Sequence, residues 1–230
     1  MTKPIAKRYQ FLYSSEQIYA QDIQTEEIVR LHVLECQKLP ELVHNAFLRR
    51  AKEFSQLKHS GLTQLLNFGF DPSNHCYFLV YEQFGGKPLK NILKGSILSP
   101  EWVLCALLEV VDALAFLHLH NMYMGYLEPG DIFLDMQAQL PLRIVDPALE
   151  SFEILLGKSD GQNRDLLQED LLKLGFLAAI LLSRNLDPKR SQIKELYPNI
   201  PTSFQVFFQR ACFEEPQPYS SVNEARRDLL

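Results

Sequence analysis

Apolar residues recur along this 230-residue chain with two different spacings. Before residue 82 they form short runs rich in β-branched residues, at 18–23, 28–34, 62–70 and 76–81. Residues 24–27 and 71–74 between these runs are polar and suited to turns, so the pattern predicts strands joined as hairpins. Residues 42–57 instead place apolar side chains at helical spacing, which predicts one amphipathic helix after the first hairpin.

The pattern becomes mainly helical after Gly85, Gly86 and Pro88, which are typical of a connection between subdomains. Ser99 followed by Pro100 is typical of a helix start, and the apolar spacing extends that helix to about His118. The remaining predicted elements are strands at 132–134 and 142–145 and helices at 166–182, 204–212 and 222–230. We therefore expect two lobes of one domain, residues 1–84 and 85–230.

Composition narrows the class of protein further. Hydrophobic residues make up 47% of the chain and charged residues 22%, as in ordinary globular proteins. The formal charge of -5 gives no general attraction for nucleic acid or anionic lipid. Four cysteines lack metal-ligand spacing, the chain starts without an apolar signal stretch, and the longest apolar run, 174–182, is too short to span a bilayer. These features predict a reduced, cytoplasmic protein with no membrane or nucleic-acid partner.

Short motifs in a fixed order resemble the protein kinase superfamily over nearly the whole chain. They include the hinge-like run 78–86, the helix end 113–118, the frame Leu127, Pro129 and Ile132 of the catalytic loop, Asp146 at the metal-binding position, and 170–175 at the start of a later helix. The resemblance implies an α+β, two-lobed protein kinase-like fold. A small five-stranded antiparallel lobe with one helix would precede a larger, mainly helical lobe. The short segments look more like the bacterial Ser/Thr branch than the animal one.

The phosphate-binding positions depart from the kinase pattern. By the resemblance, the three glycines of the phosphate loop become Phe11, Tyr13 and Glu16. His32 stands in place of the lysine that holds the phosphates. Arg50 stands in place of the helix glutamate that pairs with this lysine. The activating ion pair of a kinase therefore cannot form.

The catalytic positions depart as well. Tyr126 replaces the aspartate base, and an ordinary tyrosine is a poor proton acceptor at neutral pH. Glu128 replaces a lysine and Asp131 replaces an asparagine that binds metal. Asp146 is followed by Pro147, which we expect to restrict Asp146 to extended backbone angles. We expect no catalytic residue in this set.

Side chains are expected to close the nucleotide pocket. The resemblance places Arg30 above the adenine site, Phe133 below it and Tyr81 at its back, which predicts no nucleotide and no cofactor. Asp170 is implied to bind the catalytic-loop backbone. We further expect the guanidinium of Arg50 to grip Asp146 and lock the lobes together.

These departures predict a catalytically inactive pseudokinase that acts as a protein-binding scaffold or allosteric regulator, with a protein partner or a second copy as its ligand. Residues 39–45 and 149–168 are the candidate interface. One alternative is a divergent kinase or nucleotidyl transferase that uses Asp131 and Asp146 with a divalent cation. Another is a sensor of a ligand that is not a nucleotide. The six histidines lack metal-ligand spacing, so no metal is expected there.

Overall fold

The amino-terminal lobe is a five-stranded antiparallel sheet with the strand order β1-β2-β3-β5-β4. The computed structural model describes residues 3–12, 19–36, 39–95, 98–135, 142–158, 165–213 and 217–230. The strands are β1 (Tyr9–Leu12), β2 (Tyr19–Asp22), β3 (Ile28–Glu35), β4 (Leu65–Asp71) and β5 (Cys76–Glu82). The pattern of apolar runs gave no range for β1. The other four strands and both hairpins are confirmed.

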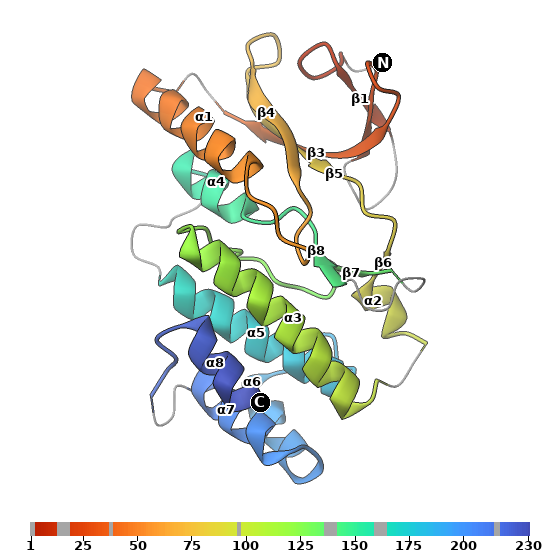
Figure 1. Ribbon diagram of the computed structural model, residues 1–230, viewed down its shortest axis with the longest axis vertical. Coiled ribbons are helices and arrows are strands. Elements are labelled where there is room, and N and C mark those ends of the chain that lie inside the picture. Colours follow the sequence, from red (N-terminus) through yellow and green to blue (C-terminus); the bar gives the residue numbers. More distant parts are fainter. Residues whose placement is uncertain are drawn as a thin grey trace.

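Helix α1 (Glu41–Ser55) covers one face of this sheet, as Figure 1 shows in orange. Phe47, Ala51 and Phe54 are buried, and their spacing places them on one side of the helix. The ring of Phe47 lies 4.5 Å from that of Tyr77 on β5 and 5.5 Å from that of Phe152. The predicted helix is therefore confirmed, and its apolar side joins the sheet to the larger lobe.

The larger lobe is mainly helical and stacks below the sheet in Figure 1. Its helices are α2 (Leu89–Ile92), α3 (Pro100–Leu119), α4 (Leu149–Leu155), α5 (Leu166–Ser183), α6 (Arg190–Ile193), the 3₁₀ helix Lys194–Asn199, α7 (Thr202–Cys212) and α8 (Val222–Leu229). A three-stranded sheet of β6 (Lys87–Pro88), β7 (Ile132–Leu134) and β8 (Leu142–Ile144) lies between the lobes. The long helices agree with the prediction, whereas the short elements α2, α4, α6 and β6 were missed.

Helix α3 is the central helix of this lobe. The Ser99 hydroxyl accepts a hydrogen bond from the Trp102 amide at 3.2 Å, so the predicted N-cap is formed. By length and composition alone α3 would suffice to cross a bilayer. It packs against α5, α8 and β8 and buries eight of its residues, so its apolar composition is also that of a core helix.

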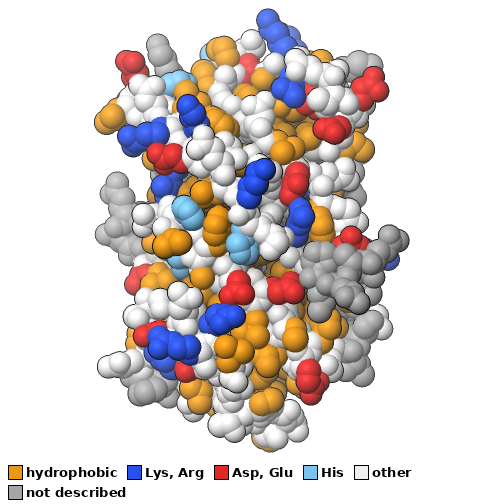
Figure 2. Space-filling model, viewed as in Figure 1, with side chains coloured by type: hydrophobic (Ala, Val, Ile, Leu, Met, Phe, Trp, Pro, Cys, Tyr) orange, Lys and Arg blue, Asp and Glu red, His pale blue; other side chains and the backbone are white. Residues whose placement is uncertain are grey.

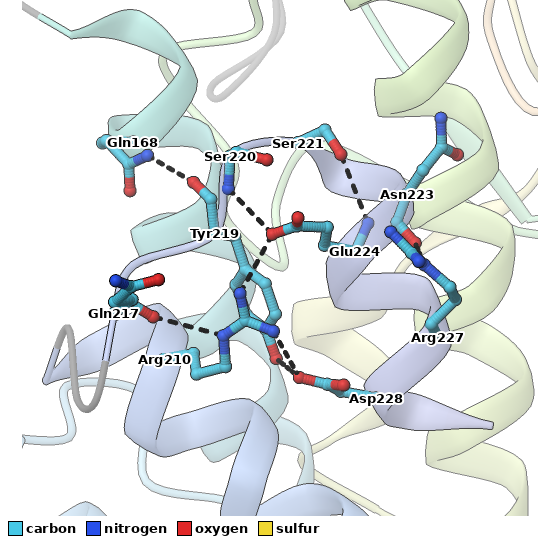
Figure 3. A network of polar contacts seen from close by, with 10 residues as sticks. All are labelled: Gln168, Arg210, Gln217, Tyr219, Ser220, Ser221, Asn223, Glu224, Arg227 and Asp228. Carbon is cyan, nitrogen blue, oxygen red and sulfur yellow. Dashed lines mark hydrogen bonds and ion pairs between the residues drawn. The ribbon is translucent and has the colours of Figure 1, made fainter.

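A polar network closes the carboxyl-terminal end of the fold (Figure 3). Arg210 on α7 donates to Glu224 at 2.9 Å and to Asp228 at 3.0 Å, both on α8. Its guanidinium carbon lies 4.1 Å from the ring centroid of Tyr219, whose hydroxyl donates to Asp228. Burial and the bond to Asp228 raise the pKa of Tyr219, so this hydroxyl stays protonated. These contacts fasten α7 to α8.

Backbone contacts connect the two lobes beside the cleft. The Thr63 amide donates to the Ile144 carbonyl at 3.0 Å, and the Ile144 amide donates to the Gly61 carbonyl at 2.9 Å. These bonds tie the segment between α1 and β4 to strand β8 of the larger lobe. They fix the position of Asp146, which lies two residues beyond Ile144.

Candidate functional site

Asp146 is the centre of a buried polar cluster between the lobes. Its Oδ1 accepts from Arg30 Nε at 2.8 Å, and its Oδ2 accepts from Arg30 Nη2. His32 Nε2 lies 2.7 Å from the same Oδ2. The Asp146 amide donates to the Thr63 hydroxyl at 3.1 Å. Two side chains of one strand, β3, therefore hold the carboxylate that a kinase would use for metal.

The electrostatics of this cluster favour the ionised carboxylate. Burial alone would raise the pKa of Asp146, but the hydrogen bonds from Arg30 and His32 lower it to about 2. Burial opposes the charge of Arg30 too, yet the bond to Asp146 leaves the pKa of Arg30 above its ordinary value. Because Asp146 is ionised, His32 must donate its Nε2 proton to it. The forked pair balances one buried charge with another.

The guanidinium of Arg30 also occupies the space between two aromatic rings. Its central carbon lies 5.7 Å from the ring centroid of Tyr19 and 5.8 Å from that of Phe133. Tyr81 is fully buried at the back of this space and donates its hydroxyl to the Pro147 carbonyl at 3.0 Å. Arg30, Phe133 and Tyr81 thus lie around the place where the kinase resemblance puts the adenine ring.

The expected pair between Arg50 and Asp146 is wrong. Arg50 Nη2 donates to the Asn121 carbonyl, and its Nη1 lies 3.9 Å from Glu53 on the same helix. Asp146 instead pairs with Arg30 and His32. Residues two apart on a strand point to the same face, so β3 can present both side chains to one carboxylate. That alternation was readable from the sequence.

The expected backbone conformation of Asp146 is also wrong. Asp146 has φ +51° and not extended angles, and Ala148 has φ +63°. A following proline disfavours the right-handed helical region but does not exclude the left-handed one. The bonds to the Asp146 amide and carboxylate hold this sparsely populated conformation in place.

Asp170 organises the segment that corresponds to the catalytic loop. Its carboxylate accepts from the amides of Met124 at 3.0 Å and Gly125 at 2.7 Å. His118 Nε2 lies 2.7 Å from the same carboxylate. Gly125 has φ +66°, and a side chain there would collide with the buried carboxylate of Glu150. Residue 125 therefore has to be glycine.

The remaining predicted positions are spread around the cleft rim. The Tyr126 side chain is 50% exposed, and Glu128 is exposed. Asp131 is partly buried and accepts from the Glu128 amide at 3.0 Å. Burial raises the pKa of Asp131 to about 6, and the nearby charges of Glu128 and Asp146 act in the same direction. Among the described residues, no group of three or more His, Cys, Asp and Glu is placed to hold a metal ion.

One of the three predicted phosphate-loop positions, Phe11, lies on a strand. Phe11 pairs with Ala20 between β1 and β2, whereas Tyr13 and Glu16 lie outside the described residues. After β5, the chain reaches β6 through residues 83–86, where a side chain at Gly86 would clash with the Leu134 backbone. The glycine of the predicted hinge is therefore required by a close approach to β7.

Comparison with known proteins identifies the fold. The structure of the Neurospora crassa PAN3 pseudokinase matches with a TM-score of 0.75 and 13% identity over all of this chain and 63% of that chain. The structure of Rad53 1–466 in complex with AMP-PNP matches with a TM-score of 0.72 and 14% identity over 98% of this chain and 66% of that one. A second structure, of the Rad53 kinase domain and SCD2 in complex with AMPPNP, matches with a TM-score of 0.64 and 14% identity over 97% of this chain and 90% of that one.

This chain therefore has a protein kinase-like fold, and the expected α+β, two-lobed class is confirmed. No protein-family model and no curated sequence matches it. The chain spans less than two thirds of the length of the first two solved chains. Since these neighbours include both a kinase and a pseudokinase, the fold leaves activity open. The likeness to the bacterial branch stays a prediction.

Proposed function

We propose that this chain is a catalytically inactive, kinase-like protein that acts by binding other proteins. The observation that carries the proposal is the internal pairing of Asp146 with Arg30 and His32. A divalent cation coordinated by Asp146 would have to displace a guanidinium that is itself buried. The metal-dependent alternative, which needs Asp131 and Asp146 together, loses one of its two carboxylates to this pair.

Other departures support the same proposal. Phosphoryl transfer needs bound phosphates, metal and an oriented nucleophile. His32 contacts Asp146 through Nε2, so this nitrogen is not available to bind a phosphate. Tyr126 stands in place of the aspartate base, and a phenol is ordinarily a poor proton acceptor at neutral pH. Glu128 adds a negative charge where phosphate would pass. Several independent groups would have to change before the cleft could transfer phosphate.

We expect no thermal stabilisation by ATP or ADP, with or without Mg²⁺ or Mn²⁺, because Arg30 fills the space beside Phe133. Incubation with labelled ATP should leave no label on the chain or on added protein substrates, and Tyr126→Asp should not restore transfer. An active kinase assayed in parallel provides the positive control. Micromolar nucleotide binding, or incorporation that disappears in Asp146→Ala, would overturn the proposal.

A groove between α1 and α4 is the surface we propose for a protein partner. It encloses about 450 Å³ and contains Arg49 and Arg50 above an apolar wall of Ile154 and Leu155. Arg49 is exposed and makes no polar contact within the described part of the chain. Leu42, on the same helix, is 83% exposed. Two guanidinium groups against the single carboxylate of Glu53 favour an acidic partner segment.

Arg49→Glu should weaken capture of protein partners by the immobilised chain, and Lys94→Glu should not, although both changes alter net charge equally. Cross-linking mass spectrometry should place the contacts on α1 and α4. Contacts that map to other faces, with capture unchanged by Arg49→Glu, would contradict this surface. A chain that stays monomeric and captures nothing would contradict the protein-binding function itself.

A further inference from the structure

A second cavity lies on the side of the lobe junction where α3 faces β4. It encloses about 300 Å³, within the range of small-molecule sites, and its walls come from both lobes. Lys58, His59 and Thr63 line it from the segment between α1 and β4, Glu82 from β5, Phe116 from α3 and Arg143 from β8. Figure 2 shows basic, acidic and histidine side chains gathered near the centre of this face.

His59 lines the cavity and carries one hydrogen-bond donor. Its Nδ1 accepts from the Gly61 amide at 3.1 Å. Burial lowers the pKa of His59, so the ring is neutral at pH 7 and must carry its proton on Nε2. The ring packs 4.9 Å from that of Phe116, which fixes its orientation. No acceptor for Nε2 is found in the described ranges of the chain.

Arg143 and Lys58 add two cationic groups. Arg143 Nη1 donates to Glu82 Oε1 at 2.6 Å, and the Gln64 amide donates to the same oxygen at 3.1 Å. The guanidinium also lies over the ring of Phe84, 4.9 Å from its centroid, and its Nε is buried without an acceptor among the described residues. The exposed Lys58 has no partner there either. Among the described residues that line the cavity the acid is Glu82, which is paired with Arg143, and the nearby Asp112 is paired with Arg226.

We propose that this cavity binds a small carboxylate, held by Lys58 and Arg143 as charged donors and by His59 as a neutral one. A carboxylate offers two oxygens that can accept from several donors at once. Two cationic side chains line the cavity, and Glu82, the acid among its lining residues, is already paired, which favours an acidic ligand over a basic one. A linear dicarboxylate such as succinate is of suitable size.

Occupancy of the cavity should stabilise the joined lobes. Thr63, in its wall, bonds to both Ile144 and Asp146, and Arg143 is the residue before Ile144. A ligand that contacts Lys58 and Arg143 together therefore bridges the two lobes. Ligands that bind the folded state alone stabilise it by RT ln(1 + [L]/Kd), so the thermal midpoint rises with the logarithm of ligand concentration above Kd.

The test is a titration of the purified chain with succinate, with sodium phosphate and sodium chloride at equal ionic strength as separate arms. Succinate should raise the thermal midpoint with the logarithmic concentration dependence of a Kd of about 1 mM or tighter. Lys58→Glu should weaken binding about tenfold, the effect of losing one charge-assisted contact. Lys52→Glu, an equal charge change on α1 outside the cavity, should leave the Kd unchanged.

A site-resolved measurement keeps the proposal testable if a variant misfolds. Succinate should shift the ring resonances of His59 in the NMR spectrum of the wild-type chain more than those of the other five histidines. The absence of saturable binding, equal losses in the two lysine variants, or shifts confined to other histidines would each overturn the proposal. Tighter binding of phosphate than of succinate would overturn the assignment to a carboxylate. The result of the succinate titration does not depend on whether the chain binds nucleotide or transfers phosphate.

Discussion

Replacing Arg30 with methionine is expected to lower the free energy of unfolding by about 3–5 kcal/mol, the cost of leaving one member of a buried ion pair alone. The buried carboxylate of Asp146 would then keep His32 as its one side-chain hydrogen-bond partner among the described residues. Methionine keeps most of the side-chain volume, so the loss reports on charge and hydrogen bonding more than on packing. Urea unfolding followed by circular dichroism measures it.

Arg50→Met provides the matched control. It also removes a guanidinium, from the residue that the sequence analysis expected to pair with Asp146. Arg50 is 31% exposed, and its side chain bonds to a carbonyl and lies near Glu53. We expect a loss of no more than about 1 kcal/mol, as for other partly exposed contacts. Equal losses in Arg30→Met and Arg50→Met would contradict the assignment of the interlobe pair.

Two further measurements test the same pair: a double-mutant cycle, and the loss of unfolding free energy at acidic pH. Arg30→Met with Asp146→Asn should be less damaging than the sum of the two single changes, because each removes the same bonds.

The pKa of Asp146, about 2, lies below its ordinary value of about 3.9. Its contribution is therefore present above pH 4 and is lost as pH falls towards 2. This acid-dependent loss should be smaller in Arg30→Met, and an unchanged loss would contradict the pairing.

The sequence was informative about the cleft and misleading about its central contact. The long helices and most strands follow from apolar spacing, and the kinase resemblance located Arg30, Phe133 and Asp146. Pairing Arg50 with Asp146 assumed that the middle of α1 points to the metal position, as a kinase glutamate does. In the structure Arg50 on α1 bonds to the Asn121 carbonyl. Arg30 on β3 takes the place beside Asp146 that we had assigned to Arg50. The length of the Arg30 side chain decided the outcome, since it reaches Asp146 from β3.

Short elements and strained backbone could not be read from the sequence. Helix α4 has seven residues, too few for a helical period to stand out, and it begins after Ala148, whose φ is positive. The buried Glu150 on α4 packs against Gly125, a contact between segments 25 positions apart that no local pattern encodes. The positive φ of Asp146 likewise results from tertiary contacts. Local propensity does not determine features of this kind.

Asp131→Asn is expected to stabilise the protein at neutral pH. The folded pKa of Asp131 is about 6, above the ordinary value of about 3.9, because the group is partly buried and near Glu128 and Asp146. A carboxyl group whose pKa is raised on folding contributes stability below about pH 4 and loses that contribution as pH rises through 6. The full shift corresponds to roughly 3 kcal/mol, which solvent screening reduces to about 1–2 kcal/mol.

Asparagine avoids this penalty and can still accept the bond from the Glu128 amide. The gain in unfolding free energy should therefore appear at pH 7.5 and vanish near pH 4, where the aspartate is already protonated in the folded state. Glu128→Gln, which removes an exposed carboxylate beside it, should change stability by no more than about 0.5 kcal/mol at either pH. A loss of stability in Asp131→Asn at pH 7.5 would contradict this account, because it would mean that the Asp131 charge helps to balance Arg30 in the closed cleft.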